Sequence, residues 1–163
     1  MTRAMKRHMQ LVLNLWPPFL GAGIRVKRLQ KDWRAIDVEM DLRFWNANFV
    51  GTHYGGSLYS MADPFYMLML IENLGRDYIV WDKSASIRFR KPGKGKMRAE
   101  FRVDESQIQE IRDKLQTLPK VEPVFRVQIK DESGALIAEV EKVLHVRKKQ
   151  RDDARNEVVT PRI

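Results

Sequence analysis

The sequence predicts an α+β fold in which a mainly antiparallel six-stranded sheet wraps around one long central helix. Three observations lead to this prediction. Residues 57–74 are largely apolar, have the length of a helix and are followed by Gly75, a residue type that often ends helices. Segments on both sides alternate apolar and polar residues with a period of two, as half-buried strands do. The apolar run at residues 65–71 leaves this helix no polar face, so the strands are expected to bury it all round.

Residues 1–20 are interpreted as an N-terminal helix and a linker. Basic residues give way to an apolar stretch over residues 3–16, and Pro17-Pro18 is expected to end the helix there. A cleaved signal peptide is the competing interpretation, but polar residues interrupt the apolar stretch and no clear cleavage site follows it. We therefore expect a retained helix that packs on the domain or on a partner, with peripheral contact to an anionic membrane as the alternative.

Six strands are predicted, two before the central helix and four after it. They are expected near residues 24–27, 36–42, 78–91, 97–103, 125–129 and 136–146, the last with a bulge between Val140 and Val143. An amphipathic helix over residues 104–116 is expected after the fourth strand, with Asp104 as its cap. The charged tail at residues 147–163 is expected to fray. Residues 1–163 are interpreted as one domain, because the sequence shows neither a repeat nor a second domain.

Composition and charge exclude some classes of chemistry. The 163 residues include no cysteine, which excludes disulfides and thiolate catalysis and fits a reducing compartment, so we expect a cytoplasmic protein. Lys and Arg number 30 against 21 Asp and Glu, and the net charge of +9 favours an anionic partner: coenzyme A phosphates, an acidic membrane surface or nucleic acid. The sequence has no fingerprint of a nucleic-acid-binding module, and its three histidines lack metal-ligand spacing. Nucleic acid is therefore disfavoured as a partner, and neither a metal nor another cofactor is expected.

A carboxylate at the start of the apolar run is the strongest candidate for chemistry. Asp63 is costly near a core unless it is paired, hydrogen-bonded or used. On a continuous helix Gly56, Ser60 and Asp63 share one face, with the backbone N–H near Gly56 placed to polarise a carbonyl oxygen and Asp63 to direct water at its carbon. In the simpler interpretation Asp63 only caps a helix that starts at Pro64. That proline is also expected to kink or break the central helix.

This stretch resembles the active-site segment of hotdog-fold acyl-CoA thioesterases, especially the phenylacetyl-CoA type and an uncharacterised branch of that superfamily. The resemblance lies in Asn48-x-x-Gly51-x-x-x-Gly55-Gly56, followed seven residues later by Asp63. It implies a hotdog fold and hydrolysis of acyl-CoA or acyl-carrier thioesters. It also implies a homodimer or a dimer of dimers with the site at the dimer interface, because the sheet leaves an edge to cover. The alternative is a non-catalytic hotdog module that binds an acyl carrier or a protein partner.

The resemblance also implies roles for single residues. Gly56 would polarise the thioester carbonyl, Asp63 would act as base or nucleophile, and Asn48 would orient the water or the thioester. The family often has histidine before the glycine pair, whereas here Tyr54 stands there and His53 lies one position earlier. In the simpler interpretation Asn48 is a turn residue and His53 a loop residue. The substrate contacts implied around the glycines are His53, Tyr54, Gly55, Ser57 and Ser60.

Two further groups of residues have both a functional and a simpler interpretation. Basic residues flank the turn at residues 92–95, and we expect Arg88, Arg90 and Lys94 to contact coenzyme A phosphates. The competing interpretation is a solvated strand face. Three methionines of the central helix either line an adaptable acyl tunnel or fill the core: Met61, Met67 and Met69.

Overall fold

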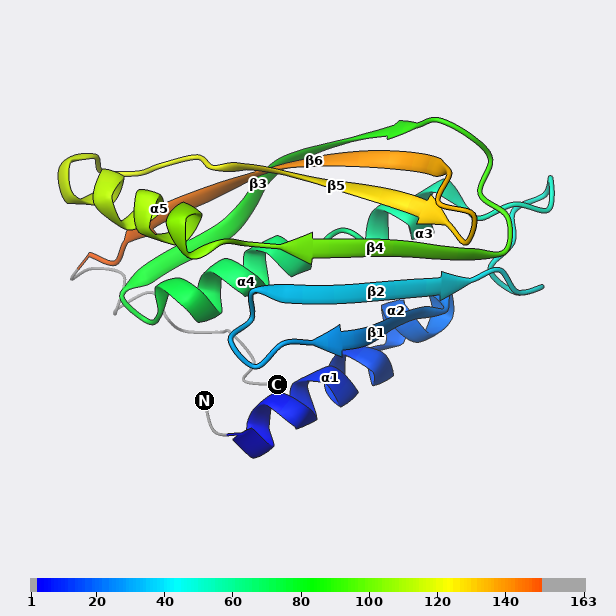
Figure 1. Cartoon of the computed structure of the whole chain (residues 1–163), viewed down its shortest axis with the longest axis horizontal. Helices are drawn as coiled ribbons and strands as arrows, with labels where there is room; N and C mark the ends of the chain where they lie inside the picture. Colours follow the sequence, from blue (N-terminus) through cyan, green and yellow to red (C-terminus); the bar gives the residue numbers. More distant parts are fainter. Residues whose placement is uncertain (1–2, 151–163) are drawn as a thin grey trace.

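Six antiparallel strands form one curved sheet in the computed structural model, which describes residues 3–150. They are β1 (Ile24–Leu29), β2 (Ala35–Asp41), β3 (Tyr78–Phe89), β4 (Lys96–Arg102), β5 (Val124–Asp131) and β6 (Leu136–Lys148). Their order across the sheet is β1-β2-β4-β5-β6-β3, so β1 and β3 are its edges (Figure 1). In β4 and β5, buried and exposed residues alternate as their sequence pattern predicts. The predicted fold class is confirmed.

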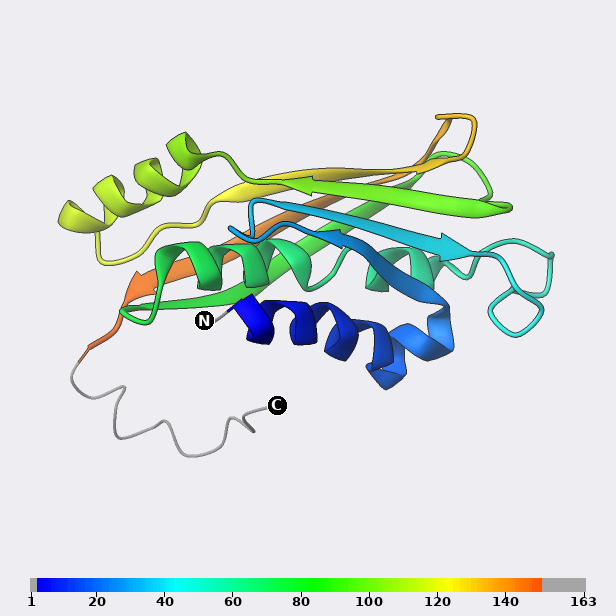
Figure 2. The same cartoon turned by 60° about the horizontal axis from the view of Figure 1, so that its bottom comes forward.

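The central helix packs on one face of this sheet in two segments, α3 (Gly55–Ser60) and α4 (Phe65–Leu74), as Figures 1 and 2 show. The hydroxyl of Tyr66 donates to the backbone carbonyl of Arg126 at 2.8 Å and ties α4 to β5. The prediction that the helix is buried all round is wrong, because the sheet covers it from one side and Ile71 remains 40% exposed. The buried residues of α4 are Phe65, Tyr66, Met69, Leu70 and Leu74.

A turn at residues 61–64 separates α3 from α4. The N–H of Ala62 donates to the carbonyl of Tyr59 at 2.8 Å, and the N–H of Asp63 donates to the carbonyl of Ser60 at 3.3 Å. These bonds span three residues instead of four, so the helix tightens and ends. Pro64 has no N–H and cannot continue an α-helical ladder, which explains why the predicted interruption lies here.

The N-terminal segment forms two helices instead of one helix and a linker. α1 (Arg3–Leu15) ends before Trp16, and α2 (Pro17–Ala22) begins with the two prolines. The first N–H groups of a helix have no partner within it, so proline fits these positions. Pro17 and Pro18 therefore end one helix and start the next, which corrects the predicted linker.

α1 closes one edge of the sheet. Asn14 accepts from the N–H of Val26 at 2.7 Å through Oδ1 and donates to the Val26 carbonyl at 3.2 Å through Nδ2. The Nε2 of Gln10 donates to the same carbonyl at 3.0 Å. These side chains satisfy groups that an edge strand otherwise leaves unpaired. The helix thus packs on the domain, and no helix within residues 3–150 is long and apolar enough to cross a membrane.

The C-terminal half follows the predicted order with two corrections. α5 (Glu105–Thr117) begins after Asp104, whose N–H donates to Oε1 of Gln107 at 2.9 Å as part of the cap. The bulge predicted between Val140 and Val143 of β6 lies instead in its partner β3, where Lys83 is the extra residue. Because residues 147 and 148 belong to β6, the charged tail starts later than predicted, and residues 151–163 lie outside the described residues.

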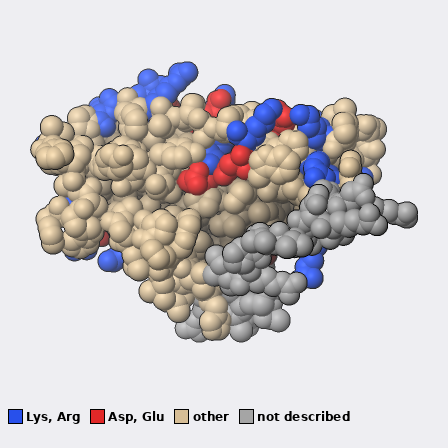
Figure 3. Space-filling view, turned by 180° about the vertical axis from the view of Figure 1, so that it is seen from behind, with Lys and Arg blue, Asp and Glu red and all other residues tan. Residues whose placement is uncertain are grey.

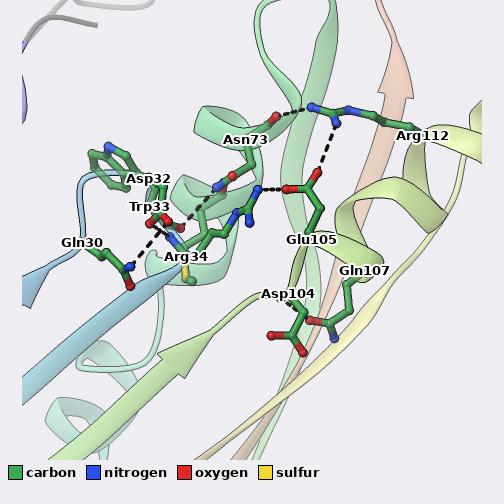
Figure 4. Close-up of polar contacts among 10 residues, drawn as sticks. Gln30, Asp32, Trp33, Arg34, Asn73, Asp104, Glu105, Gln107 and Arg112 are labelled. Atoms are coloured by element: carbon green, nitrogen blue, oxygen red, sulfur yellow. Dashed lines mark hydrogen bonds and ion pairs between the residues drawn. The ribbon is translucent and has the colours of Figure 1, made fainter.

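A polar network holds the C-terminal end of α4 (Figure 4). The Nδ2 of Asn73 donates to the carbonyl of Trp33 at 3.3 Å, and the Asn73 carbonyl accepts from Nη2 of Arg112 at 2.7 Å. Glu105 forms ion pairs with both Arg34 and Arg112. These contacts join α4 to the β1–β2 turn and to α5, so the helix is fixed at the end opposite to Asp63.

Candidate active site

One lysine and two aspartates meet where α3 and α4 are separated. The Nζ of Lys142, on β6, lies 2.8 Å from Oδ1 of Asp63 and 3.1 Å from Oδ2 of Asp82, on β3. The Lys142 side chain is 0% exposed, whereas the Asp63 side chain is 46% exposed. Tyr59, on α3, completes the group with its Oη 3.5 Å from Nζ. We call Lys142, Asp63, Asp82 and Tyr59 the lysine cluster.

Lys142 is not among the predicted site residues, although the strand pattern contains a signal for it. Inward positions of β6 are every second residue, and Val140 and Leu144 on either side are buried apolar residues. Lys142 falls in the same register, so a lysine stands where the alternation favours a core residue. A charge at such a position is tolerated only with partners, which predicts carboxylates nearby.

Asp82 faces Lys142 because of the bulge in β3. Asp82 pairs with the inward-facing Leu144, and Ala85 pairs with Lys142. In a regular strand, residues 82 and 85 would point to opposite faces, since side chains alternate with a period of two. The extra residue, Lys83, restores Asp82 to the inward face and thereby brings it to the lysine.

The lysine cluster contains one cation for two carboxylates. Burial by itself lowers the pKa of Lys142, but hydrogen bonds and charges from Asp63 and Asp82 outweigh it and raise the pKa above its usual value. Lys142 is therefore charged at neutral pH. Burial raises the pKa of Asp82, Lys142 opposes this, and the Asp63 charge adds to it. Burial raises the pKa of Tyr59, and its hydrogen bond to Asp63 adds to this.

Asp63 does not cap α4. The N-cap position is held by Pro64, and no side chain makes a capping hydrogen bond there. Because α3 ends at Ser60, the expected continuous helical face from Gly56 to Asp63 is also absent. The turn at residues 61–64 instead directs the carboxylate to Lys142. The simple capping interpretation is therefore wrong for this residue.

An uncharged groove of about 730 Å³ lies beside α3. Its walls come from α2, the loop after β2, and α3, and they bring together five of the predicted site residues: Asn48, Tyr54, Gly56, Ser57 and Ser60. The other lining residues are Pro17, Pro18, Gly21, Ala22, Trp45, Asn46, Ala47 and Phe49. Asp63 does not line the groove but follows α3 by a hydrogen-bonded turn from Ser60. Viewed from behind, the molecule shows a small group of acidic side chains next to basic ones, with a broad uncharged surface to their left (Figure 3).

The glycine pair begins α3 beside two aromatic rings. A Cβ at Gly56 would lie 2.3 Å from Cε1 of Tyr54, and a Cβ at Gly55 would lie 3.1 Å from Cζ of Phe89. Neither glycine has a positive φ, so close approach, and not turn geometry, favours glycine here. As the first residues of α3, both have N–H groups without an acceptor inside the helix. The N–H of Gly56, which lines the groove, can therefore meet a carbonyl oxygen bound there.

Asn48 closes its own loop. Its Oδ1 accepts from the N–H groups of Val50 and Thr52 at 3.1 and 3.0 Å, and its Nδ2 donates to Oγ1 of Thr52 at 2.9 Å. These bonds agree with the turn-residue interpretation, in which the side chain shapes one wall of the groove. Nδ2 also donates to the carbonyl of His53 at 3.4 Å, so contact between Nδ2 and a substrate would require one of its two bonds to open.

Asn46, which the sequence analysis did not select, joins two walls of the groove. Its Nδ2 donates to the carbonyl of Ala22, at the end of α2, at 2.8 Å and to the carbonyl of Asp41 at 2.9 Å. Its Oδ1 accepts from the N–H of Arg43 at 2.7 Å. The buried amide thus fixes the spacing between α2 and the loop.

His53 is a buried anchor of the loop and does not line the groove. Its Nε2 lies 2.8 Å from the carbonyl of Gly95, and its backbone N–H donates to the carbonyl of Gly93 at 2.9 Å. A carbonyl only accepts, so Nε2 carries the proton. Burial lowers the pKa of His53, against smaller effects of the Gly95 carbonyl and the Asp41 charge. These contacts agree with the loop-histidine interpretation.

Two of the three predicted phosphate contacts face away from the groove. Arg90 donates to Oε2 of Glu139 through Nε and Nη2 at 3.1 and 2.6 Å. Arg88 borders a hollow on the outer face of the sheet, where it is opposite the same glutamate. Both therefore agree with the solvated-face interpretation. Lys94 has a different location from Arg88 and Arg90. It is exposed in the turn that holds His53 near the groove.

The methionines of the central helix are core residues. Met61 and Met69 are 0% exposed, and Met67 is half-buried against the same core. None of them is among the residues that line the groove, so their burial agrees with the core-filler interpretation. Within residues 3–150, no group of three or more His, Cys, Asp or Glu side chains is arranged to hold a metal ion.

Comparison with known proteins now adds a family and a set of similar folds. The sequence pattern of the family described as Domain of unknown function (DUF4442) matches residues 4–146. A Pseudomonas aeruginosa protein of unknown function, named a probable thioesterase, is 24% identical with a TM-score of 0.76. That likeness covers 91% of this chain and 97% of the other. No curated protein matches the chain.

Two other solved structures carry the word thioesterase in their names. A thioesterase from Haemophilus influenzae is 14% identical with a TM-score of 0.62, and the likeness covers 88% of this chain and 90% of the other. A variant of a second Pseudomonas aeruginosa thioesterase is 10% identical with a TM-score of 0.65, covering 87% of this chain and 94% of the other. At these identities the likeness establishes a shared fold, which is the hotdog fold.

Proposed function

The chain belongs to the family described as Domain of unknown function (DUF4442), and on this premise we propose that it hydrolyses acyl thioesters. The observation that carries the proposal is the half-exposed carboxylate of Asp63, held by the buried Lys142 at the end of the groove-lining helix α3. Carboxylates placed in this way serve as general bases or nucleophiles. The thioesterase names of proteins with the same fold support the reaction class.

In the proposed reaction Asp63 takes a proton from a water molecule as its oxygen attacks the thioester carbonyl carbon. The carbonyl oxygen becomes negatively charged and accepts from the N–H of Gly56, which stabilises the tetrahedral intermediate. The C–S bond then breaks, and the thiolate takes the proton from Asp63 as it leaves. The products are a carboxylic acid and a free thiol. Direct attack by Asp63 through a mixed anhydride is the alternative route.

The groove beside α3 is proposed to hold the acyl group. Its lining has no charged side chain, and Gly56 and Ser57 place the start of α3 within it. An apolar acyl chain loses contact with water there without burying a charge. In this arrangement Tyr54 and Ser60 contact the substrate, whereas Asn48 and Asn46 keep the walls in place.

The carrier part of the thioester is proposed to pass the turn at residues 92–95. Lys94 is the predicted basic residue that is exposed on the side of His53, whereas Arg90 is already bound to Glu139. The ammonium group of Lys94 suits the phosphates of coenzyme A or of a phosphopantetheine arm. Both acyl-CoA and acyl-carrier thioesters fit this proposal.

We also propose a homodimer formed through β3, alone or as part of a dimer of dimers. β3 is hydrogen-bonded to β6 on one side only, and its exposed residues include Trp81 and Phe89. An open edge of this length favours pairing with a second chain. The exposed leucines of α1 and α2 support peripheral membrane contact as a separate proposal: Leu11, Leu15 and Leu20.

The test is thiol release from a set of coenzyme A thioesters that differ in acyl group, measured with the wild type and with Asp63→Asn. We expect the wild type to hydrolyse at least one of them and Asp63→Asn to be slower by roughly a hundredfold or more. Asp104→Asn is the matched control, because it removes the charge of an exposed cap residue on α5. An Asp63→Asn variant with the parental rate would end the catalytic claim for Asp63. A wild type that hydrolyses none of the thioesters would favour the non-catalytic module that binds an acyl carrier or a protein partner.

A further inference from the structure

Resting on the proposed function, we infer that Lys142 is a positioning residue for Asp63: it fixes one carboxylate oxygen and leaves the other for the reacting water. The fully buried Nζ contacts Oδ1 of Asp63 at 2.8 Å. The same Asp63 side chain remains 46% exposed. The carboxylate is thus tied from the core side and open on the solvent side.

The position of Lys142 explains how a carboxylate in a short turn acquires a fixed direction. Asp63 lies between two helices, makes no capping bond and has no regular element of its own to hold it. Lys142 is on β6, whose neighbours β5 and β3 hydrogen-bond to it along both sides. A strand paired on both sides therefore sets the direction of a side chain that lies in a short turn.

Asp82 has a different part in the cluster. Its Oδ2 contacts Nζ at 3.1 Å, but its other oxygen is buried and has no hydrogen-bond partner among the described residues. Because Asp82 is the less exposed carboxylate, it compensates the lysine charge from within. The titratable groups that face Nζ are thus Asp63 from the turn, Asp82 from β3 and Tyr59 from α3.

A purely structural explanation of the cluster predicts different behaviour. A buried lysine needs carboxylates to be stable in the fold, and Asp63 would then serve Lys142 instead of the reverse. Under that explanation, replacing the pair of Lys142 and Asp82 by neutral groups of similar shape leaves the chemistry of Asp63 unchanged. Under the positioning inference, the same replacement leaves Asp63 in place but without a fixed direction.

The test compares Asp82→Asn with the double variant Lys142→Met and Asp82→Asn. Asp82→Asn keeps the contact between Lys142 and Asp63, whereas the double variant removes the buried cation and the buried anion together and so avoids an unpaired charge. Circular dichroism first checks that both variants are folded. We then expect kcat of the double variant to be lower than kcat of Asp82→Asn by roughly tenfold to a hundredfold, with a similar KM.

A second measurement uses the protein without substrate. Nuclear magnetic resonance of isotope-labelled lysine Cε follows the titration of Lys142, identified by its absence in the double variant. The pKa of Lys142 is raised partly by Asp63, so Asp63→Asn should lower it. An unchanged Lys142 titration in Asp63→Asn overturns the inference whatever the enzyme activity is.

The outcomes separate this inference from the proposed function. If the wild type hydrolyses thioesters but the two variants have equal kcat, the role assigned to Lys142 is wrong and the proposed function stands. If the wild type hydrolyses none of the thioesters, the proposed function fails and the positioning role fails with it. A loss that lies mainly in KM, with kcat unchanged, also contradicts positioning and indicates a change in substrate binding instead.

Discussion

Asn14 of α1 and Val26 of β1 are joined by two hydrogen bonds, at 2.7 and 3.2 Å, that close one edge of the sheet. The opposite edge, β3, has no such cover within the described chain, since its only strand partner there is β6. One covered edge and one open edge indicate where a second copy would add.

The open edge leads to a prediction on assembly. If two copies pair through β3, the protein should be a dimer or a multiple of it by light scattering. Backbone amides along residues 84–89 should then exchange slowly with solvent, although half of them have no acceptor in the single chain. Dilution to monomer should accelerate their exchange while β5 remains protected. A protein that is monomeric at high concentration, with fast exchange at this edge, contradicts the prediction.

Asp63 and Asp104 should respond differently to loss of the carboxylate. Asp104 occupies the N-cap of α5, so Asp104→Ala is expected to cost about 1 kcal/mol and to lower Tm by roughly 2–4 °C. Asp63 makes no capping bond, and Asp63→Asn leaves Lys142 paired with Asp82, so its Tm should change less. Thermal unfolding followed by circular dichroism measures both. A larger loss in Asp63→Asn would show that Asp63 mainly stabilises the fold.

The groove should respond to a side chain added at Gly21. A Cβ at this position meets no atom within 4 Å, so Gly21→Leu can extend into the groove without a clash at Cβ. We expect kcat/KM to fall several-fold for long-chain acyl thioesters and to change little for the acetyl thioester. Gly21→Ala is the graded control, with a smaller effect in the same direction. An equal loss for short and long substrates would argue that the acyl chain lies elsewhere.

Lys94 and Arg90 form a matched pair for testing carrier contact. Lys94→Ala should raise KM for acyl-CoA with little change in kcat, which is the pattern of lost uniform binding. Arg90→Ala should leave KM nearly unchanged, because the guanidinium already binds Glu139. With the corresponding thioester of a short thiol that carries no phosphates, Lys94→Ala and the wild type should have the same KM and kcat. Unchanged acyl-CoA kinetics in Lys94→Ala would exclude this turn as the phosphate contact.

His53 should make folding sensitive to mild acid. Burial lowers the pKa of His53 in the folded state, and its Nδ1 is buried without a hydrogen-bond partner. The unfolded chain therefore binds this proton more readily, so the stability contribution is complete above about pH 6.5 and is lost as the pH falls further. Between about pH 7.5 and about pH 5, Tm of the wild type should fall more than Tm of His53→Gln. The pKa of His145 is also lowered, mainly by burial, but it affects both proteins equally. Equal losses of Tm would contradict the prediction.

The fold could be predicted because its signals are local. Alternation in the strands, the apolar segment of the central helix and Pro64 each act within a few residues of their own position. The wrong prediction of a linker at the N-terminus arises because a local signal there fits two structures. Pro17 and Pro18 are compatible with both the end of one helix and the start of another, and only the packing of α2 beside the groove distinguishes the two.

The candidate site could be predicted only in part. The segment from Asn48 to Asp63 was identifiable because its residues are close in sequence, and the groove brings five of the selected residues together. Whether Asn48 reaches a substrate or its own loop depends on where its hydrogen bonds go, which spacing does not reveal. Spacing likewise does not reveal which basic residues near the turn are already paired. Arg90 binds Glu139 of β6, whereas Lys94 does not.

The sequence by itself determined the elements, the interruption at Pro64 and the presence of a carboxylate beside a buried helix. It did not determine the partner of that carboxylate, because Lys142 is 79 positions away from Asp63. Only the pairing of β6 with β3, and the bulge at Lys83, place one lysine between two aspartates. Contacts of this kind depend on strand register, and register is a property of the assembled sheet.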